Sequence, residues 1–232
     1  MNIHSFQFNL FQVHTLVVWK QCPECVVVDP GFYTGAEKGA FFSFLASEGL
    51  RPEAVLLTHA HIDHIYGVKA IIDTFGRIPV YMDDREMANI AYAPEAAPRF
   101  GLDVPDCSFA TTPIHDGETI SAAGLEFEVI STPGHAPGAV CYLEKEEETM
   151  FTGDTLFAGT IGRSDLKFGE YDNLIESIME KLIVLPGDIR IIPGHGREST
   201  IGWERTHNPF LEPFNEPEEE IDPDAPPITI HA

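Results

Sequence analysis

One short motif concentrates side chains of the kind that bind metal ions. Residues 58–64 have the sequence THAHIDH, three histidines and one aspartate directly after the apolar residues 54–57. Side chains alternate along an extended backbone, so His59 and His61 are expected to point the same way and to bind one ion. Asp63 and His64 lie where the chain turns towards a helix and are expected to face a second ion. The motif therefore indicates a metal site.

Three further ligand-type residues follow later apolar runs that are typical of strands. They are His135 in TPGH, Asp154 in FTGD and His195 in PGHG, each beside a glycine where the chain can turn sharply. Any one of them alone would most simply be a hydrogen-bonded loop residue. One loop rarely completes a coordination shell, however, so the motif predicts partners of this kind downstream. The other histidines lack such grouping and are interpreted as structural or surface residues: His4, His14, His115, His207 and His231.

The spacing of apolar residues predicts the elements that must position these side chains. Up to about residue 113 it predicts strands over 6–19, 26–29, 55–57 and 78–82, and helices over 36–48, 67–75 and 83–91. Beyond it, strands are predicted over 125–130, 139–143, 149–152 and 189–192, and a helix over 171–185. Each half could form a sheet covered by helices on one face. We therefore predict an α/β fold, a four-layer αββα sandwich, built from a single domain over residues 1–214.

The charge balance limits the possible partners. The chain has 14 basic and 37 acidic residues and a formal charge of -23, which repels nucleic acid and anionic membrane surfaces. Residues 215–232 are acidic and rich in proline, and are predicted to form a tail outside the domain.

The start of the chain lacks the features of a targeting segment, and no apolar run approaches the length of about 20 residues that a membrane span needs. We expect a cytoplasmic protein that acts on a small molecule. The sequence does not indicate its oligomeric state.

The cysteines do not suggest a disulfide framework, since there are only four in the chain. Cys22 and Cys25 form a single C-x-x-C pair in QCPEC, which falls in a predicted hairpin turn. We interpret the pair as turn residues, and a redox or metal clip is the alternative. No G-x-S-x-G motif is present, so no serine nucleophile of that kind is expected.

The successive segments THAHIDHIYG, STPGHAPGA, TGDTLF and IPGHG resemble the motifs of the metallo-β-lactamase superfamily, in order across about residues 29–196. The resemblance implies that His59, His61 and His135 hold one metal ion, that Asp63, His64 and His195 hold another, and that Asp154 bridges them. Nitrogen and oxygen ligands suit zinc, iron or manganese, and zinc is the first expectation. Two divalent ions about 3.5 to 4 Å apart can generate a bridging hydroxide and polarise a substrate carbonyl.

Within the superfamily, the chain is similar to the glyoxalase II (hydroxyacylglutathione hydrolase) group, which hydrolyses thioesters, and to its short single-domain relatives. The similarity rests on VDPG at residues 28–31, on the Gly-Arg segment after TGDTLF, and on NPFL at residues 208–211. It implies an acyl thioester substrate, catalytic roles for Asp63 and Asp154, and a place for Arg163 at the mouth of the site, paired with a substrate carboxylate. An ordinary surface arginine in a glycine-rich turn is the alternative for Arg163. The chain lacks the C-terminal helical domain that binds glutathione in full-length members, so the thiol carrier stays open.

Three other classes of function are also compatible with the sequence. The same fold supports persulfide dioxygenases, which use a single iron ion. It also supports hydrolases of lactones, of other esters and of β-lactams, and phosphodiesterases, although the charge of -23 disfavours nucleic acid substrates. A different class is a non-catalytic binding protein that retains the fold, but such chains usually lose ligands, and none is missing from this one.

Overall fold

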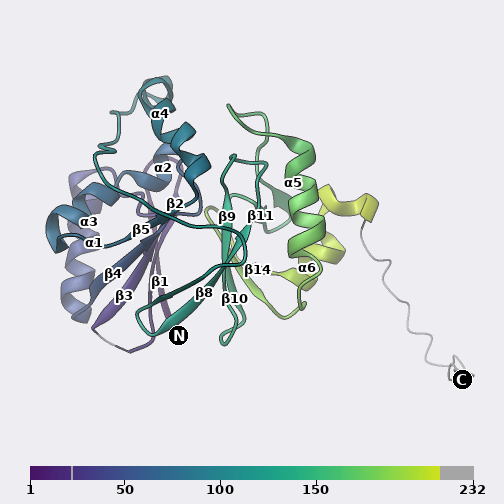
Figure 1. The fold of residues 1–232 in the computed structure, drawn as a ribbon, viewed down its shortest axis with the longest axis horizontal. Coiled ribbons are helices and arrows are strands. Elements are labelled where there is room, and N and C mark those ends of the chain that lie inside the picture. Colours follow the sequence, from purple (N-terminus) through teal and green to yellow (C-terminus); the bar gives the residue numbers. More distant parts are fainter. Residues whose placement is uncertain (22, 215–232) are drawn as a thin grey trace, which may run out of the picture.

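Two mixed β-sheets pack face to face, and helices cover the outer face of each (Figure 1). The computed structural model describes residues 1–21 and 23–214. Figure 1 shows α1 to α4 on the outside of the first sheet and α5 and α6 on the outside of the second. The predicted αββα sandwich is therefore confirmed. The predicted acidic tail and Cys22 lie outside the described residues, and the single-domain boundary stays a prediction.

The first sheet is formed by the N-terminal half and the second by the C-terminal half, as expected. The first has the strand order β1 (Asn2–Phe8), β2 (Val13–Trp19), β3 (Glu24–Val28), β4 (Arg51–Leu56), β5 (Val80–Met82), β6 (Thr112–Pro113). The second has the order β14 (Ser199–Thr200), β13 (Arg190–Pro193), β10 (Thr149–Gly153), β9 (Val140–Glu144), β8 (Leu125–Ser131), β7 (Thr119–Ala122). A small hairpin joins β11 (Leu156–Phe157) to β12 (Thr160–Ile161).

The helices follow the strands in layers. On the first sheet they are α1 (Gly35–Glu48), α2 (Ile62–Ile65), α3 (Val68–Phe75), the 3₁₀ turn η1 (Asp84–Glu86), α4 (Met87–Ala96) and η2 (Ala97–Phe100). On the second they are α5 (Tyr171–Ser177), the π-helical turn η3 (Ile178–Leu182), α6 (Ile201–His207) and η4 (Pro209–Phe214). In the described part of the chain, no helix is both long and apolar enough to cross a membrane.

Three apolar layers hold these elements together. Between the sheets, Val26 and Val28 of β3 pack with Phe127, Tyr142 and Phe151 of the second sheet. On the outer face of the same strand, Val27 packs against α1. A third layer lies between the second sheet and α5. Because β3 is buried on both faces, it has a continuous apolar run instead of an alternating one.

The structure corrects several predicted boundaries. Residues 6–19, predicted as one strand, form two antiparallel strands joined by a tight turn in which Asn9 and Gln12 have positive φ angles of 53° and 56°. The predicted helix 83–91 is a 3₁₀ turn followed by a helix that continues to Ala96. The predicted helix 171–185 is α-helical only to Ser177. Apolar spacing alone reports neither a turn inside an apolar run nor a change of helix type.

Strand direction determines where the candidate ligands can lie. Strands β3 to β6 run parallel. In the second sheet β9 is antiparallel to both β8 and β10, and β13 is parallel to β10, so β8, β10 and β13 share one direction. The carboxyl ends of parallel strands meet at one edge of a sheet. The loops that follow β4, β8, β10 and β13 therefore gather at the edges where the two sheets meet.

Candidate metal centre

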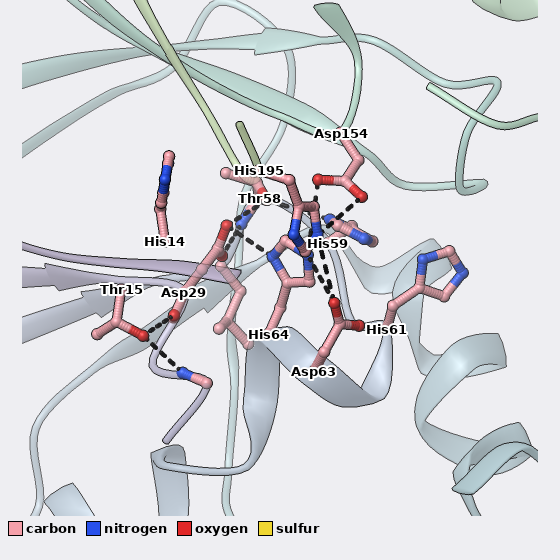
Figure 2. Close-up of polar contacts among 12 residues, drawn as sticks. His14, Thr15, Asp29, Thr58, His59, His61, Asp63, His64, Asp154 and His195 are labelled. Atoms are coloured by element: carbon pink, nitrogen blue, oxygen red, sulfur yellow. Dashed lines mark hydrogen bonds and ion pairs between the residues drawn. The ribbon is translucent and has the colours of Figure 1, made fainter. Parts of the chain in front are cut away.

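All seven predicted ligands come together at this edge, from four separate loops. His59 and His61 follow β4, and Asp63 and His64 lie in the short helix α2. His135 follows β8, Asp154 directly follows β10, and His195 follows β13. Figure 2 shows His59, Asp63, His64, Asp154 and His195 converging at the centre of the site.

Three histidine rings form the first group of candidate ligands. His61 Nδ1 lies 2.9 Å from His135 Nε2, which lies 3.3 Å from His59 Nε2. Tetrahedral ligands about 2.0 Å from a zinc ion would be separated by roughly 3.3 Å. These three rings are therefore spaced as ligands of one ion would be. One nitrogen atom from each ring lies within 4.8 Å of the other two.

The second group combines a carboxylate with two rings. His195 Nε2 lies 3.3 Å from Asp63 Oδ2, and His64 Nε2 lies 3.6 Å from the same oxygen. One ligand atom from each of Asp63, His64 and His195 lies within 4.8 Å of the other two. Each predicted set of three ligands thus forms a compact group of atoms, and a third such group, His59, His64 and Asp154, connects the two sets.

Asp154 lies between the two groups. Its Oδ2 is 3.5 Å from His135 Nε2 in the first group and 3.5 Å from His195 Nε2 in the second. Its Oδ1 is 3.6 Å from His64 Nε2. Among the described residues, Asp154 Oδ1 and His64 Nε2 are the buried side-chain polar atoms that lack any hydrogen-bond partner. Buried polar atoms without partners are costly, and a cation between them would satisfy both. The site therefore fits divalent metal ions.

The two groups differ in charge. Burial and the neighbouring His135 lower the pKa of His61 to about 3, so this ring of the first group is neutral at pH 7. Burial also lowers the pKa of His64, but the carboxylates of Asp63, Asp29 and Asp154 outweigh it and raise that pKa to about 9. Carboxylates that stabilise a proton also stabilise a metal cation. The second group is therefore the more anionic of the two candidate sites.

Hydrogen bonds on the far side of the rings orient three of them. His64 Nδ1 lies 3.0 Å from a carboxylate oxygen of Asp29, His135 Nδ1 lies 2.7 Å from the carbonyl oxygen of Arg163, and His195 Nδ1 lies 2.9 Å from that of Phe11. These oxygens can only accept, so each Nδ1 carries a proton and each Nε2 is the nitrogen that faces the site and would bind a metal ion. This arrangement is usual for histidines that bind metals.

Asp29 is a functional residue that the sequence interpretation identified only as part of a turn. It is 2% exposed, and Oδ1 accepts a hydrogen bond of 2.8 Å from the Thr58 backbone N–H. Its Oδ2 accepts from the Thr58 hydroxyl and from His64 Nδ1 (Figure 2). Asp29 thus fixes both the start of the THAHIDH loop and the ring of one candidate ligand.

Glu86 in η1 is a second residue that the sequence interpretation missed. It is 0% exposed, and its Oε2 accepts a 2.7 Å hydrogen bond from the Ala60 N–H, while Oε1 accepts one of 2.7 Å from the Gly138 N–H. These two amides belong to the loops that carry His59, His61 and His135. Glu86 therefore ties together the two loops that form the first group.

Replacing Glu86 with glutamine is expected to loosen this group. The amide NH₂ of glutamine would face one of the two backbone N–H groups, of Ala60 or Gly138, that donate to the Glu86 carboxylate. Two donors would then face each other. Leaving a buried donor unpaired costs about 1–3 kcal/mol of unfolding free energy. We expect Glu86→Gln to unfold at lower urea concentration and to retain less metal. Glu95→Gln, a change at an exposed position of α4, is the matched control. Equal metal content in Glu86→Gln and the wild type would contradict this role.

Two features of the loop around His195 explain its position. A Cβ atom at Gly194 would lie 2.3 Å from Asp154 Oδ1 and 2.9 Å from the His64 ring, so only glycine allows the backbone this close to the site. The buried His14 donates from its backbone to the Gly194 carbonyl oxygen, and its Nδ1 bonds the Pro193 carbonyl oxygen. The interpretation of His14 as structural is in agreement with these contacts.

A cavity of about 750 Å³ opens over the candidate ligands. Its lining includes His61, Asp63, His135, Asp154 and His195, so a bound molecule could reach both groups. Arg163 also lines this cavity, at an exposed position where its guanidinium forms two 3.0 Å hydrogen bonds to the Asp165 carboxylate. The structure thus places Arg163 in the cavity wall and not among the clustered ligands.

Comparison with known proteins identifies the class to which this fold and site belong. The sequence profile of the metallo-β-lactamase superfamily matches residues 8–195, a range that contains all seven candidate ligands. The two mixed sheets flanked by helices are the fold of that family. The chain belongs to the metallo-β-lactamase superfamily.

Three individual proteins are similar to this chain along nearly its full length. The chain is 36% identical over 216 residues to hydroxyacylglutathione hydrolase GloC of Haemophilus influenzae, covering 91% of this chain and 98% of that protein. It resembles the solved structure of the BLEG-1 B3 metallo-β-lactamase with a TM-score of 0.83 and 36% identity, over 90% of this chain and 99% of that one. It also resembles TTHA1623, solved in a di-iron-bound form, with a TM-score of 0.80 and 33% identity, over 90% and 100% of the two chains. Family and site together define a metallohydrolase with ligand groups for two ions.

Proposed function

We propose that this protein hydrolyses acyl thioesters at a centre of two divalent metal ions, in the manner of glyoxalase II. The observation that carries the proposal is the pair of ligand groups with Asp154 between them, at the base of a cavity large enough for a thioester. The similarity to GloC along nearly the full length of both chains supports this choice of substrate class.

In this proposal each residue keeps the role that its contacts suggest. His59, His61 and His135 would hold one ion, Asp63, His64 and His195 would hold the other, and Asp154 would bind both. Two such ions would lower the pKa of a water molecule at the site and polarise the thioester carbonyl. Zinc is the proposed metal, and iron is the alternative because a relative is known in a di-iron form.

The protein's own residues position the reactants. Asp63 and Asp154, which both line the cavity, would orient the attacking water and accept its hydrogen bonds. Attack on the carbonyl carbon forms the new C–O bond, and the C–S bond then breaks to give a carboxylic acid and a thiol. A thiolate is a good leaving group because the pKa of a thiol is about 8.5, so no strong general acid is required. Arg163 pairs with a carboxylate of the substrate, which would exchange with Asp165.

Thioester hydrolysis by protein of known metal content tests this function. The panel contains S-lactoylglutathione, a lactoyl thioester of coenzyme A and one of N-acetylcysteamine, with oxygen esters, a lactone and a β-lactam for comparison. We expect at least one thioester to be hydrolysed faster than every other class, and activity to disappear on chelation and return with metal. Fully metal-loaded protein that hydrolyses none of the thioesters would refute the proposal.

A further inference from the structure

The cavity lining contains a larger share of basic residues than the chain as a whole. The whole chain has only 14 lysines and arginines against 37 acidic residues. Four of the basic residues line the cavity: Arg99, Arg163, Lys167 and Arg197. Among the described residues that line it, Asp165 is the only acidic one besides the candidate ligands Asp63 and Asp154. The lining therefore has four basic and three acidic residues, in a chain whose formal charge is -23.

Two of these cations are grouped on one aromatic ring, on the side of the cavity formed by α4 and η2. Lys167 Nζ lies 4.5 Å from the centroid of the Tyr92 ring, and the Arg99 guanidinium carbon lies 5.6 Å from it. Tyr92 thus brings together a cation from the N-terminal half of the chain and one from the C-terminal half. We call Tyr92, Arg99 and Lys167 the aromatic-cationic cluster.

The cluster differs from the other cations of the cavity wall in its charge balance. Arg163 is paired with Asp165, whereas neither Arg99 nor Lys167 forms an ion pair with any carboxylate in the described part of the chain. Two like charges held near one ring repel each other, and an anion bound beside them would reduce this repulsion. Tyr92, Ala96 and Phe100 add apolar surface beside them in the same cavity lining.

We propose that the aromatic-cationic cluster binds an anionic group of the thiol carrier, while the reacting carbonyl lies at the metal centre. This inference rests on the proposed thioesterase function and adds a binding site to it, separate from Arg163. The cavity of about 750 Å³ is much larger than a small acyl group requires, so the carrier accounts for most of the bound molecule. Carboxylates of a peptide thiol and phosphates of a nucleotide thiol share the chemistry that the cluster recognises.

Binding of non-hydrolysable carriers to the metal-loaded protein tests the site without relying on activity. The probes are S-methylglutathione, S-methyl coenzyme A and the neutral S-methyl-N-acetylcysteamine, measured by isothermal titration calorimetry. We expect the wild type to bind at least one anionic probe more tightly than the neutral one. In the double variant Arg99→Gln/Lys167→Gln, the affinity for the anionic probe divided by the affinity for the neutral probe should fall about tenfold or more. In the wild type, the preference for the anionic probe should weaken with added salt. The preferred anionic probe then identifies the carrier as a peptide or a nucleotide.

A matched control separates local binding from the change in net charge. Lys20→Gln/Lys145→Gln removes the same two charges at exposed positions paired with Glu146 and Glu128, away from the cavity lining, and should preserve the wild-type ratio. An unchanged ratio in Arg99→Gln/Lys167→Gln, or no preference for either anionic probe in the wild type, would overturn the inference. Hydrolysis of the neutral thioester by the wild type reports on the proposed function separately, so the two can fail independently.

Discussion

Replacing Asp154 with asparagine is expected to lower kcat/KM for the proposed thioester hydrolysis at least about 1,000-fold, because several kcal/mol of charge stabilisation would depend on the ions that Asp154 is proposed to hold. Asp154 is the residue whose oxygens lie within 3.6 Å of nitrogen atoms in both ligand groups. Asparagine retains one oxygen, but it loses the negative charge and presents an amide N–H₂ that cannot bind a cation. The variant should therefore hold fewer ions as well as react more slowly. Steady-state kinetics and metal analysis of the same sample measure both effects.

The matched control for this variant is Asp165→Asn. Asp165 lines the same cavity, but it is exposed, forms an ion pair with Arg163 and belongs to neither ligand group. Its substitution should leave the metal content unchanged, whatever its effect on substrate affinity. If Asp154→Asn retained the full metal content and kcat/KM within a few-fold of the wild type, Asp154 would not be a bridging ligand.

Replacing Asp29 with alanine is expected to have the largest effect on folding. Its carboxylate accepts hydrogen bonds from the Thr58 N–H at 2.8 Å, the Thr58 hydroxyl at 2.6 Å and His64 Nδ1 at 3.0 Å, all of them buried. Alanine would remove the acceptor of all three bonds, and breaking a buried network that contains a charge typically costs about 3–5 kcal/mol. Urea denaturation of the metal-free protein measures this cost without a contribution from metal binding.

The conservative variant Asp29→Asn separates the effect on folding from the effect on the metal centre. Asparagine tolerates the positive φ of 47° at this position and can still accept from the Thr58 N–H. Its amide group, however, would donate towards His64 Nδ1, which would move the ring proton to Nε2 and remove the lone pair that faces the site. We expect Asp29→Asn to be more stable than Asp29→Ala but to lose metal from the second group. Wild-type metal content in Asp29→Asn would show that Asp29 does not orient His64.

The ligands could be predicted from the sequence because each follows its strand within a few residues. His59, His135, Asp154 and His195 all stand just beyond apolar runs, and parallel strands bring such positions to one edge. The division into two sheets could also be predicted, because the pattern of mixed helices and strands changes to mainly strands from residue 119 onward. The resemblance of the four motifs to a known superfamily assigned the ligands to two ions.

The supporting residues could not be predicted because their partners are distant in the sequence. Glu86 contacts backbone atoms 26 and 52 residues away, and nothing near it in the sequence marks it as buried. Asp29 was visible in the VDPG turn, but its bond to His64 spans 35 residues. The cluster on Tyr92 likewise joins residues from the two halves of the chain, so its cations could be counted in the sequence but not located.

The tight turn at residues 9–12 is a related case. Asn9 has a positive φ angle, and its side-chain amide donates to the carbonyl oxygens of Gly31 and Asp63, so the turn supports α2. The surrounding apolar residues concealed this turn within what looked like one long strand. Asparagine is among the few residues that adopt a positive φ readily, and this was the available signal.

Metal quantification on the purified protein tests the central claim, a centre of two ions, most directly. Mass spectrometry of the metal content after removal of loosely bound ions should give about two equivalents per chain in the wild type, and fewer in Asp154→Asn. A single tightly bound iron ion per chain, with oxygen consumed when glutathione persulfide is added, would contradict the two-ion account and favour a dioxygenase. A metal-free protein that folds with unchanged stability and gains none on adding zinc, iron or manganese would contradict it entirely.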